Sequence, residues 1–424
     1  MRTSFSTAQL HELAEVENNL RKCVHCGICS ATCPTYVLLG DERDSPRGRI
    51  VMMQQMLEEG GAPSPETVHH VDRCLSCLAC VTACPSSVDY RRLVDTARSH
   101  IETHHARPAG ERAVRWIVAN VMTRPALAGL GLFFARLSAP LAHFLPERLR
   151  AMAKAGARKF HRVNVRVPPQ SLPRGAPRVA LMPGCVQKAM APEIDKATAR
   201  VLARRGLRLV PLEDAGCGGA LGHHLGYAED ARGWAKRAIE AFERAGGAEA
   251  FAAILITATG CSAHLKDLAH LFRGDKVWET RAQAFAATVR DFSELATPRA
   301  ATPPRRLRIA YHAACSLQNG LKLTGAGEAL LDAAGFDVLA IPEGHLCCGS
   351  AGSYSILQPQ LAGALRERKL ANIALLNADA VASGNIGCLA HLAGNDGPPF
   401  VHLAELLDWA EGGPEPVALK EVRG

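Results

Sequence analysis

Apolar residues in the N-terminal quarter of the chain recur with the period of an α-helix. Leu13, Val16 and Leu20 fall on one face of a first predicted helix. A second predicted helix covers RGRIVMMQQMLEE, with Ser45 as its N-terminal cap and Gly60 as the residue that ends it. The pattern of residues 1–105 therefore predicts an α-helical domain.

From residue 177 onward the pattern changes to short β-rich runs separated by helical stretches. The runs VALM, AAILITA and ADAVAS predict strands, and EIDKATARVLARRG and GEALLDAAG predict helices between them. Strands that alternate with helices are typical of a parallel sheet in an α/β domain. The whole chain is therefore predicted to be an α+β multidomain protein.

The α/β part of the chain contains an internal repeat. RVALMPGC resembles LRIAYHAAC, GLRLVPLEDAGCGGALG resembles GFDVLAIPEGHLCCGSAG, and ATGCSAHL resembles NIGCLAHL. The repeats are predicted to occupy residues 177–295 and 306–412, with the basic, proline-containing stretch ATPRAATPPRRLR between them. We therefore expect a duplicated α/β domain.

Residues 106–176 are predicted to form a helical connector and linker. Arginine and proline break the apolar stretch within residues 113–146, so no piece reaches the roughly 20 residues that span a bilayer. Residues 126–135, followed by Leu137 and Leu141, are interpreted as a buried connector. The alternative is that they lie on a membrane surface or on a partner subunit.

The composition of the 424-residue chain is that of a globular protein with two or three domains. Its net charge of +8 favours acidic partners, anionic substrates or an anionic membrane surface. No basic stripe is interleaved with aromatic residues, so a nucleic-acid partner is not expected.

The chain has 15 cysteines. Whether they form disulfide bonds or bind metals depends on the redox state of the compartment that holds the protein. The N-terminal residues MRTSFSTAQLHELAEVENNL contain no apolar core of a signal peptide, so we expect the reducing cytoplasm. Thiols stay reduced there, and clustered cysteines then favour metal ligation over disulfide bonds.

Two cysteine runs near the N-terminus, CVHCGICSATCP and CLSCLACVTACP, both have the spacing C-x2-C-x2-C-x3-C-P. In two-cluster ferredoxins the first three cysteines of such a run bind one [4Fe-4S] cluster, and the fourth binds the other. Zinc sites are the alternative, but two complete copies of this signature favour iron-sulfur clusters. The predicted ligand sets are Cys23, Cys26, Cys29 and Cys84 for the first cluster, and Cys74, Cys77, Cys80 and Cys33 for the second.

Three other residues near the first run have two interpretations each. Arg47 and Arg49 either steady a negatively charged cluster or are ordinary surface arginines of a helix. His25 lies between two predicted ligands, where it either donates a hydrogen bond to a cluster sulfur or simply packs.

The two α/β repeats offer unequal sets of metal ligands. A further iron-sulfur cluster or a zinc ion would suit both sets, and buried cysteines without metal are the alternative. The first repeat is poorer because Gly218 replaces the second cysteine of an adjacent pair. The candidate ligands are Cys315, Cys347, Cys348, Cys388 and His391 in the second repeat, and Cys185, Cys217, Cys261 and His264 in the first.

Taken together, these segments resemble the iron-sulfur subunit of bacterial glycolate oxidase, also called glycolate dehydrogenase. The resemblance covers nearly the whole chain, and TYVLLGDERDSPRGRI between the cysteine runs makes it specific. The repeats are similar to the CCG domain, which heterodisulfide reductase, anaerobic glycerol-3-phosphate dehydrogenase and lactate-utilisation proteins share. Gly218, His264 and His391 depart from the fuller CCG pattern, so a noncubane cluster of the heterodisulfide reductase type is not expected here, least of all in the first repeat.

The resemblance implies an electron-transfer subunit that works with FAD-containing glycolate oxidase subunits. Those partners would oxidise glycolate to glyoxylate, and a membrane quinone would be the final acceptor, which implies a peripheral position at the inner face of the cell membrane. No G-x-G-x-x-G fingerprint is present, so FAD is expected only in the partner subunits, and the chain alone should not act on substrate.

Three alternatives stay open at this point. The substrate of the partners could be lactate or glycerol 3-phosphate. The repeats could form a thiol or disulfide reductase of the heterodisulfide-reductase kind. Both repeat sites could be zinc scaffolds for subunit assembly.

Overall fold

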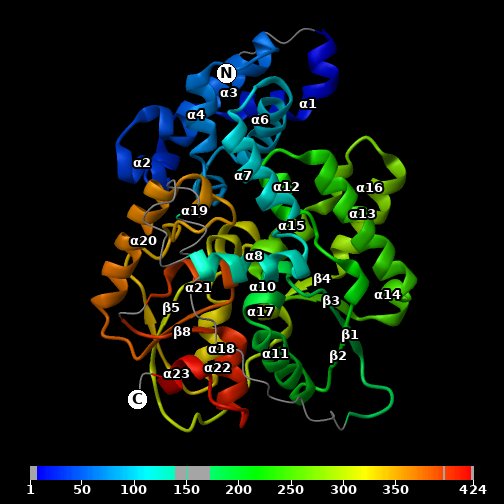
Figure 1. The fold of residues 1–424 in the computed structure, drawn as a ribbon, viewed down its shortest axis with the longest axis vertical. Coiled ribbons are helices and arrows are strands. Elements are labelled where there is room, and N and C mark those ends of the chain that lie inside the picture. Colours follow the sequence, from blue (N-terminus) through cyan, green and yellow to red (C-terminus); the bar gives the residue numbers. More distant parts are fainter. Residues whose placement is uncertain (1–6, 139–149, 151–171, 395–396, 422–424) are drawn as a thin grey trace.

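The computed structural model describes residues 7–138, 150, 172–394 and 397–421. Figure 1 shows a helical N-terminal region at the top of the molecule and two α/β lobes below it, one green and one yellow to red. The predicted fold class, a helical ferredoxin-like domain followed by a duplicated α/β domain, is confirmed.

The N-terminal region is helical, and within residues 7–138 the described chain contains no strand. The predicted second helix is α3, where the Ser45 side chain accepts from the Gly48 N–H, and Gly60 ends the helix with φ 65°. The elements are α1 (Thr7–Lys22), η1 (Ile28–Ser30), α2 (Pro34–Leu39), η2 (Glu42–Asp44), α3 (Pro46–Glu59), α4 (Pro65–Asp72), α5 (Ala79–Thr82) and α6 (Tyr90–His104).

The first repeat forms a four-stranded parallel sheet in the order β2-β1-β3-β4. Its strands are β1 (Arg178–Leu181), β2 (Arg208–Pro211), β3 (Ala253–Ile256) and β4 (Val289–Asp291). Its helices are α10 (Cys185–Met190), α11 (Glu193–Arg204), η4 (Glu213–Ala215), α12 (Ala220–His224), α13 (Ala228–Arg244), α14 (Gly247–Ala250), α15 (Thr259–Lys266), η5 (Leu268–Phe272), α16 (Lys276–Thr288) and α17 (Phe292–Leu295).

The second repeat has the same strand order, β6-β5-β7-β8, again all parallel. Its strands are β5 (Arg308–Tyr311), β6 (Asp337–Ala340), β7 (Ala380–Ser383) and β8 (Phe400–His402). Its helices are η6 (Ser316–Gly320), α18 (Ala326–Ala333), α19 (Tyr354–Leu357), α20 (Pro359–Ala374), α21 (Ile386–Leu392), α22 (Leu403–Ala410) and α23 (Val417–Glu421). The repeat seen in the sequence is therefore a repeat of topology.

The two sheets share one hydrophobic core. Leu181 and Leu255 of the first sheet belong to the same buried cluster as Ile309 and Ala382 of the second. Helix α11 packs on α22, and α17 packs on α18, so each repeat covers part of the other. The side chain of His402 also crosses between them, with Nε2 3.0 Å from the Thr257 carbonyl. Because apolar burial supplies most folding free energy, the repeats depend on each other for stability.

The connector contains α7 (Ala109–Asn120) and α8 (Pro125–Ser138). The expectation of a buried connector is wrong for the outer face of α8, where Phe133 is 61% exposed and Leu137 66% exposed. None of the described helices is both long and apolar enough to span a bilayer. Leu141 lies outside the described residues, as do residues 139–149 and 151–171 of the predicted connector and linker.

Candidate metal centres and the cavity between them

The two N-terminal cysteine loops share an unusual backbone conformation. The residue before the second cysteine has positive φ in both loops, 54° at His25 and 51° at Ser76. The residue after it is Gly27 in one loop, with φ 81°, and Leu78 in the other, with φ 60°. Positive φ is uncommon for residues with a side chain, so its recurrence indicates that the loops are built for one shared purpose.

The structure brings the first predicted ligand set together. Burial is the main cause that raises the pKa of the Cys29 thiol to about 11, and the nearby thiols of Cys23 and Cys84 contribute. One small pocket is lined by all four cysteines of the set, Cys23, Cys26, Cys29 and Cys84. Such thiols stay protonated at neutral pH. A bound metal would displace their protons, because the thiolate is the form that binds metals.

The second predicted set is also brought together, and Cys33 joins the thiols of the other run. Burial raises the pKa of Cys80 well above its usual value, and the neighbours Cys77, Cys74 and Cys33 add to the shift. The crossed arrangement predicted from the spacing, in which the fourth cysteine of each run joins the other, therefore agrees with the positions of the side chains. The assignment of ligands to clusters stays a prediction.

Arg49 is a fully buried residue beside Cys33, not a surface arginine. Its Nη1 lies 3.8 Å from the Cys33 sulfur, and its Nη2 donates to Thr35 Oγ1 and to Asp44 Oδ1, both at 3.0 Å. Asp44 is itself fully buried and also accepts from Arg73 at 2.8 Å. Asp44 and Thr35 were not among the predicted site residues, although both lie within the segment TYVLLGDERDSPRGRI.

Arg47 differs from Arg49, because its guanidinium bonds to the backbone of the first cysteine loop and to Glu42. Its Nη1 donates to the His25 carbonyl at 3.1 Å, and its Nε pairs with Glu42 at 2.5 Å. A Cβ added at Gly27 would lie 2.6 Å from Arg47 Nη1, so the glycine leaves room for this arginine. Arg47 therefore holds the first cysteine loop in place.

The spacing of the eight ferredoxin thiols argues against single zinc ions. Zn–S bonds of about 2.3 Å set the sulfurs of a tetrahedral zinc site roughly 3.8 Å apart. Among the described residues, which include all eight thiols, two groups of three or more candidate ligands have every ligand atom within 4.8 Å of the others, and neither contains a ferredoxin cysteine. One of these groups is Asp41, Asp44 and His70, where Arg49 and Arg73 already supply positive charge to Asp44.

The first repeat brings its predicted thiols together. The sulfur of Cys185 lies 3.9 Å from that of Cys217, and this hydrogen bond, followed by burial, raises the pKa of Cys185. Cys217 and burial together raise the pKa of Cys261 to about 12, with burial the larger cause. His264 directs Nε2 to the Gly218 carbonyl at 3.0 Å, so that nitrogen is already engaged.

The second repeat contains an equivalent thiol pair and two further cysteines beside it. Cys315 and Cys347 have their sulfurs 3.8 Å apart, and Cys348 interacts with both Cys347 and Cys388. The predicted ligand His391 directs Nε2 to the Ala362 carbonyl at 3.2 Å. The sequence missed His312, which with Cys348 and Cys388 forms the other compact group of candidate ligands in the described residues.

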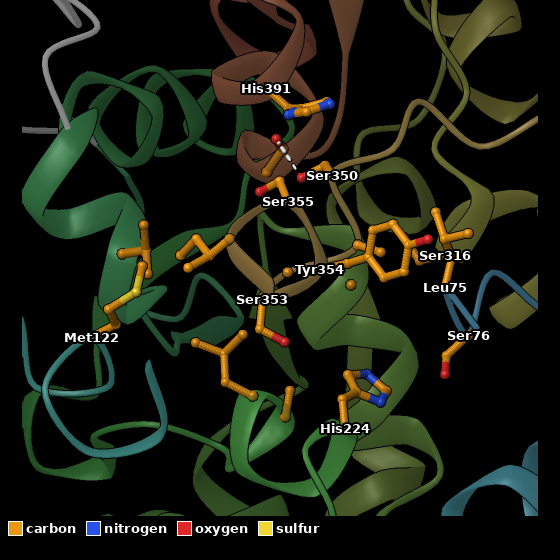
Figure 2. A pocket seen from close by; sticks show the side chains of 18 of the residues that line it. Leu75, Ser76, Met122, His224, Ser316, Ser350, Ser353, Tyr354, Ser355 and His391 are labelled. Carbon is orange, nitrogen blue, oxygen red and sulfur yellow. Dashed lines mark hydrogen bonds between the residues drawn. The ribbon is translucent and has the colours of Figure 1, made fainter. Parts of the chain in front are cut away.

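A cavity of about 740 Å³ lies between the N-terminal region and the two repeats. Figure 2 shows Tyr354 between His224 and His391, which lie on opposite sides of this cavity. Burial lowers the pKa of His224 well below its usual value, so its imidazole is neutral. The candidate ligands of the repeats that line it are Cys185, Cys217, Cys261, His264, Cys315, Cys347, Cys348, Cys388 and His391, and Ala128, Gly131 and Ala135 line it from α8.

One cysteine loop of the N-terminal region reaches the second repeat directly. Cys77 and Cys315 pack against a single apolar cluster that contains Leu75, Cys347 and Tyr354. The proximity of Cys315 is the second cause, after burial, that raises the pKa of Cys77. Candidate metal ligands from two domains therefore meet at this contact.

Comparisons with known proteins follow the same division of the chain. The family model for the 4Fe-4S dicluster domain matches residues 22–88, and the model for the cysteine-rich CCG domain matches residues 179–266 and 309–393. The glycolate oxidase iron-sulfur subunit of Escherichia coli (strain K12) is 38% identical over 404 residues, which cover 93% of this chain and 95% of that protein. The chain belongs to the family of glycolate oxidase iron-sulfur subunits.

Other similarities are consistent with that family. The probable glycolate oxidase iron-sulfur subunit of Bacillus subtilis (strain 168) is 30% identical and covers 93% of this chain and 95% of that protein. Lactate utilization protein A of Exiguobacterium sp. is 29% identical over 55% of this chain and 97% of its own length. A crystal structure of a hypothetical protein from Helicobacter pylori has a TM-score of 0.51 at 10% identity, covers 98% of this chain and 75% of that chain, and shows a shared fold.

Membership of the glycolate oxidase iron-sulfur subunit family makes the chain an oxidoreductase subunit that transfers electrons. The dicluster and cysteine-rich domains make iron-sulfur clusters its cofactors. The expected cofactor class and the recognised family are thereby confirmed.

Proposed function

We propose that this chain is the electron-transfer subunit of a flavin-dependent dehydrogenase that oxidises glycolate. FAD-containing partner subunits take two electrons from the hydroxy acid and pass them singly to this chain. The substrate is drawn from the names of the two full-length relatives, both glycolate oxidase subunits. The chain itself contributes positions for metal centres and no flavin fingerprint.

The ferredoxin cysteines are proposed to hold two [4Fe-4S] clusters in the crossed arrangement. Bound there, the clusters would supply one-electron carriers at potentials set by burial and by hydrogen bonds to sulfur. Arg49 acts on this site from within the domain, because its guanidinium approaches Cys33 and is held by Asp44. Arg98 fixes the other loop, donating to the Cys74 carbonyl at 2.6 Å and to Ser76 Oγ at 2.7 Å.

The observation that carries the proposed direction of electron flow is the contact of Cys77 with the second repeat. Asn319 accepts from Thr82 Oγ1 and donates to the Cys77 carbonyl, both at 3.0 Å, and so fixes the cysteine loop on η6. The second repeat adds thiols at that point, whereas the first repeat is joined to the ferredoxin domain through the Arg92–Asp267 ion pair at 2.6 Å. We therefore place the exit from the ferredoxin domain at the second repeat.

A peripheral membrane position and a quinone acceptor complete the proposal. The supporting feature is α8, whose apolar outer face exposes Leu130, Phe133, Phe134 and Leu137 while Gly131 and Ala135 line the cavity. Exposed aromatic and aliphatic side chains on one helix suit the interfacial layer of a bilayer. A lipophilic acceptor in that layer would then be close to the cavity that the cysteines line.

The test uses the chain purified together with its flavin partners under anaerobic conditions. On addition of glycolate, electron paramagnetic resonance is expected to show reduced iron-sulfur clusters. Cys77→Ala should abolish reduction of an added quinone while the partner flavin is still bleached by substrate. Clusters that stay oxidised with glycolate would refute the proposed substrate.

Lactate is the second candidate substrate, because lactate utilization protein A resembles more than half of this chain. The same preparation distinguishes the two. Faster reduction by lactate than by glycolate at equal concentration would move the proposal to a lactate dehydrogenase and leave the electron-transfer role intact.

A further inference from the structure

The second repeat contains an inner group of three candidate ligands, His312, Cys348 and Cys388. All three side chains are buried, with 3%, 1% and 3% exposed surface, and their ligand atoms all lie within 4.8 Å of one another. Around a tetrahedral ion with thiolate and imidazole ligands these atoms would be about 3.5–3.8 Å apart. An approach of roughly 1 Å would therefore close the group around one ion.

His312 has a ring nitrogen that the protein leaves unsatisfied. Its Nε2 is buried and has no hydrogen-bond partner among the described residues. An unsatisfied buried polar atom costs free energy, so a native structure that keeps one needs a reason. Burial, and then the nearby Lys369 cation, lower the pKa of His312 to about 3, which keeps the imidazole in the neutral form that binds metals.

Two polar groups lie beside the two buried sulfurs, whose thiols would give up their protons to a bound metal. Asn385 donates from Nδ2 to the Cys388 sulfur at 3.2 Å. Lys369 is 2% exposed, donates to the Glu343 carbonyl at 2.7 Å, and lies near enough to Cys348 for their charges to interact. An amide donor and a buried cation stabilise negative charge on sulfur, as a metal-thiolate site requires.

The first repeat serves as an internal comparison, and Met182 stands where the second repeat has His312. The Met182 N–H donates to the Leu255 carbonyl at 3.1 Å, and the His312 N–H donates to the Ala382 carbonyl at 2.8 Å. Both residues directly follow the first strand of their sheet, β1 or β5. The two residues hold equivalent backbone positions, and the imidazole of the second repeat is replaced by a flexible thioether in the first.

The first repeat also lacks a counterpart of Cys348 at the equivalent turn. Gly218 and Cys348 each precede a glycine of nearly equal conformation, Gly219 with φ 89° and Gly349 with φ 93°. A Cβ at Gly218 would lie 2.6 Å from Cδ2 of the buried Leu265, so a cysteine there would require the Leu265 side chain to move. The space that holds a ligand in the second repeat is filled by apolar packing in the first.

The donor to sulfur is missing as well. Ala258 is the N-cap of α15, at the place where Asn385 is the N-cap of α21. The first repeat thus lacks the imidazole, the second thiol and the amide donor together. The joint absence of all three is expected if His312, Cys348 and Asn385 together bind or support one metal ion. It is not expected if each side chain only fills space in the core.

We propose that His312, Cys348 and Cys388 bind one soft transition-metal ion, zinc or an iron of a cluster, and that His312 supplies its nitrogen ligand in place of His391. One imidazole and two thiolates suit both metals, which is the shared chemistry of the two sources. The inference deepens the proposed function at the second repeat. The test of this inference measures bound metal. The assignment of His312 can therefore be wrong while the proposed electron transfer from the flavin partner is still correct.

The experiment measures zinc and iron in the full-length chain purified anaerobically, together with its variants. X-ray absorption at the zinc edge reports nitrogen and sulfur ligands, and pulsed electron paramagnetic resonance with ¹⁵N-histidine reports a nitrogen bound to iron. His312→Met introduces the residue of the first repeat and should weaken metal binding by at least about 10–100-fold, the loss seen when even outer-shell partners are removed. His312→Cys preserves a ligand and should retain the ion with a sulfur in place of the nitrogen.

The matched control is His391→Met, which should leave the metal content and the nitrogen signal unchanged. Nitrogen lost from a zinc site, or from an iron site, in His312→Met supports the proposal and names the metal. Equal metal content and an unchanged nitrogen signal in His312→Met overturn it. If His312→Met does not fold, Asn385→Ala tests the same site, and unchanged metal affinity there counts against the proposal.

Discussion

Asn319 of the second repeat donates a hydrogen bond to the main-chain carbonyl of Cys77, 3.0 Å away in the ferredoxin domain. A side chain from one domain is thereby tied to the backbone of a predicted cluster ligand in another. The same amide group accepts from Thr82, the last residue of the short helix α5, which begins two residues after Cys77.

Replacing Asn319 by leucine should loosen this contact. Each lost hydrogen bond is worth about 0.5–1.5 kcal/mol, so the docking of the two domains should weaken by roughly 1–3 kcal/mol. With substrate and flavin partners present, we expect the ferredoxin clusters to be reduced as before and the quinone to be reduced more slowly. Stopped-flow absorbance on both events measures this. The control is Asn372→Leu, because Asn372 donates only to Pro342 and Glu343 of its own repeat in the described contacts. Equal quinone rates in wild type and Asn319→Leu would show that this contact is not on the electron path.

Replacing Arg49 by methionine should have two effects. It leaves the fully buried Asp44 with fewer cationic partners, and breaking a buried ion pair costs about 3–5 kcal/mol. It also removes positive charge from beside Cys33, which should lower the reduction potential of the cluster bound there. Chemical denaturation and a redox titration followed by electron paramagnetic resonance measure the two effects.

Arg43→Met is the matched control, because Arg43 lies on the same segment but pairs with Asp41 and Glu66 at the surface. Because the Arg43 guanidinium is exposed to solvent, the substitution should leave stability nearly unchanged and both potentials unaltered. If Arg43→Met and Arg49→Met shift the potential equally, the effect is one of overall charge and not of contact with Cys33.

His402 predicts a pH dependence of stability. Burial lowers its pKa from 6.5 to about 4, while its Nδ1 accepts from the Ala404 N–H at 3.1 Å. Because the folded pKa is depressed, the unfolded chain binds a proton first, and stability present above pH 6.5 is lost as the pH falls toward 4. The loss at His402 should amount to about 3 kcal/mol at the acid end of this window.

The neighbouring Glu405 acts in the opposite sense. Burial raises its pKa from 4.5 to about 7, so its contribution is largest at low pH and is lost as the pH rises through 7. Denaturation curves at several pH values separate the two groups. The difference between wild type and His402→Asn, which keeps an N-cap, should shrink from pH 7 to pH 4, and the difference for Glu405→Gln should change the other way. A constant difference for His402→Asn would show that this histidine does not titrate with folding.

Substituting Phe133 and Phe134 by serine should reduce binding to vesicles. Both rings are more than half exposed on α8, and each would contribute buried apolar area in a bilayer interface. Co-sedimentation with vesicles containing anionic lipid should show most of the loss in the double variant. Val277→Ser, at an exposed apolar residue of the first repeat, is the control. Unchanged sedimentation of the double variant would instead assign the face of α8 to a protein partner.

The fold could largely be predicted because its signals are local and repeated. Alternation of β-rich runs with helices, and the recurrence of whole cysteine-bearing segments, specify two similar parallel sheets without any knowledge of their contacts. The ferredoxin ligands were predictable for a similar reason, because the spacing within each run limits where its thiols can point.

Residues that act through tertiary contacts were not predictable in this way. Arg49 looks like a surface residue of α3 until its buried partner Asp44 is in place. His391 was predicted as a ligand because it lies three residues after Cys388. In the structure its Nε2 faces the Ala362 carbonyl. His312 lies the same distance before Cys315, and only the comparison with Met182 in the other repeat gives it meaning.

The continuous core beneath the two sheets has a consequence for how the two repeats could diverge. A domain that needed its metal to fold could not lose ligands without unfolding. Here Leu181, Leu255 and Ile309 bury their side chains in one shared interior, so the fold of the first repeat does not depend on a histidine at Met182 or a cysteine at Gly218. The two repeats can therefore carry different sets of ligands on the same architecture.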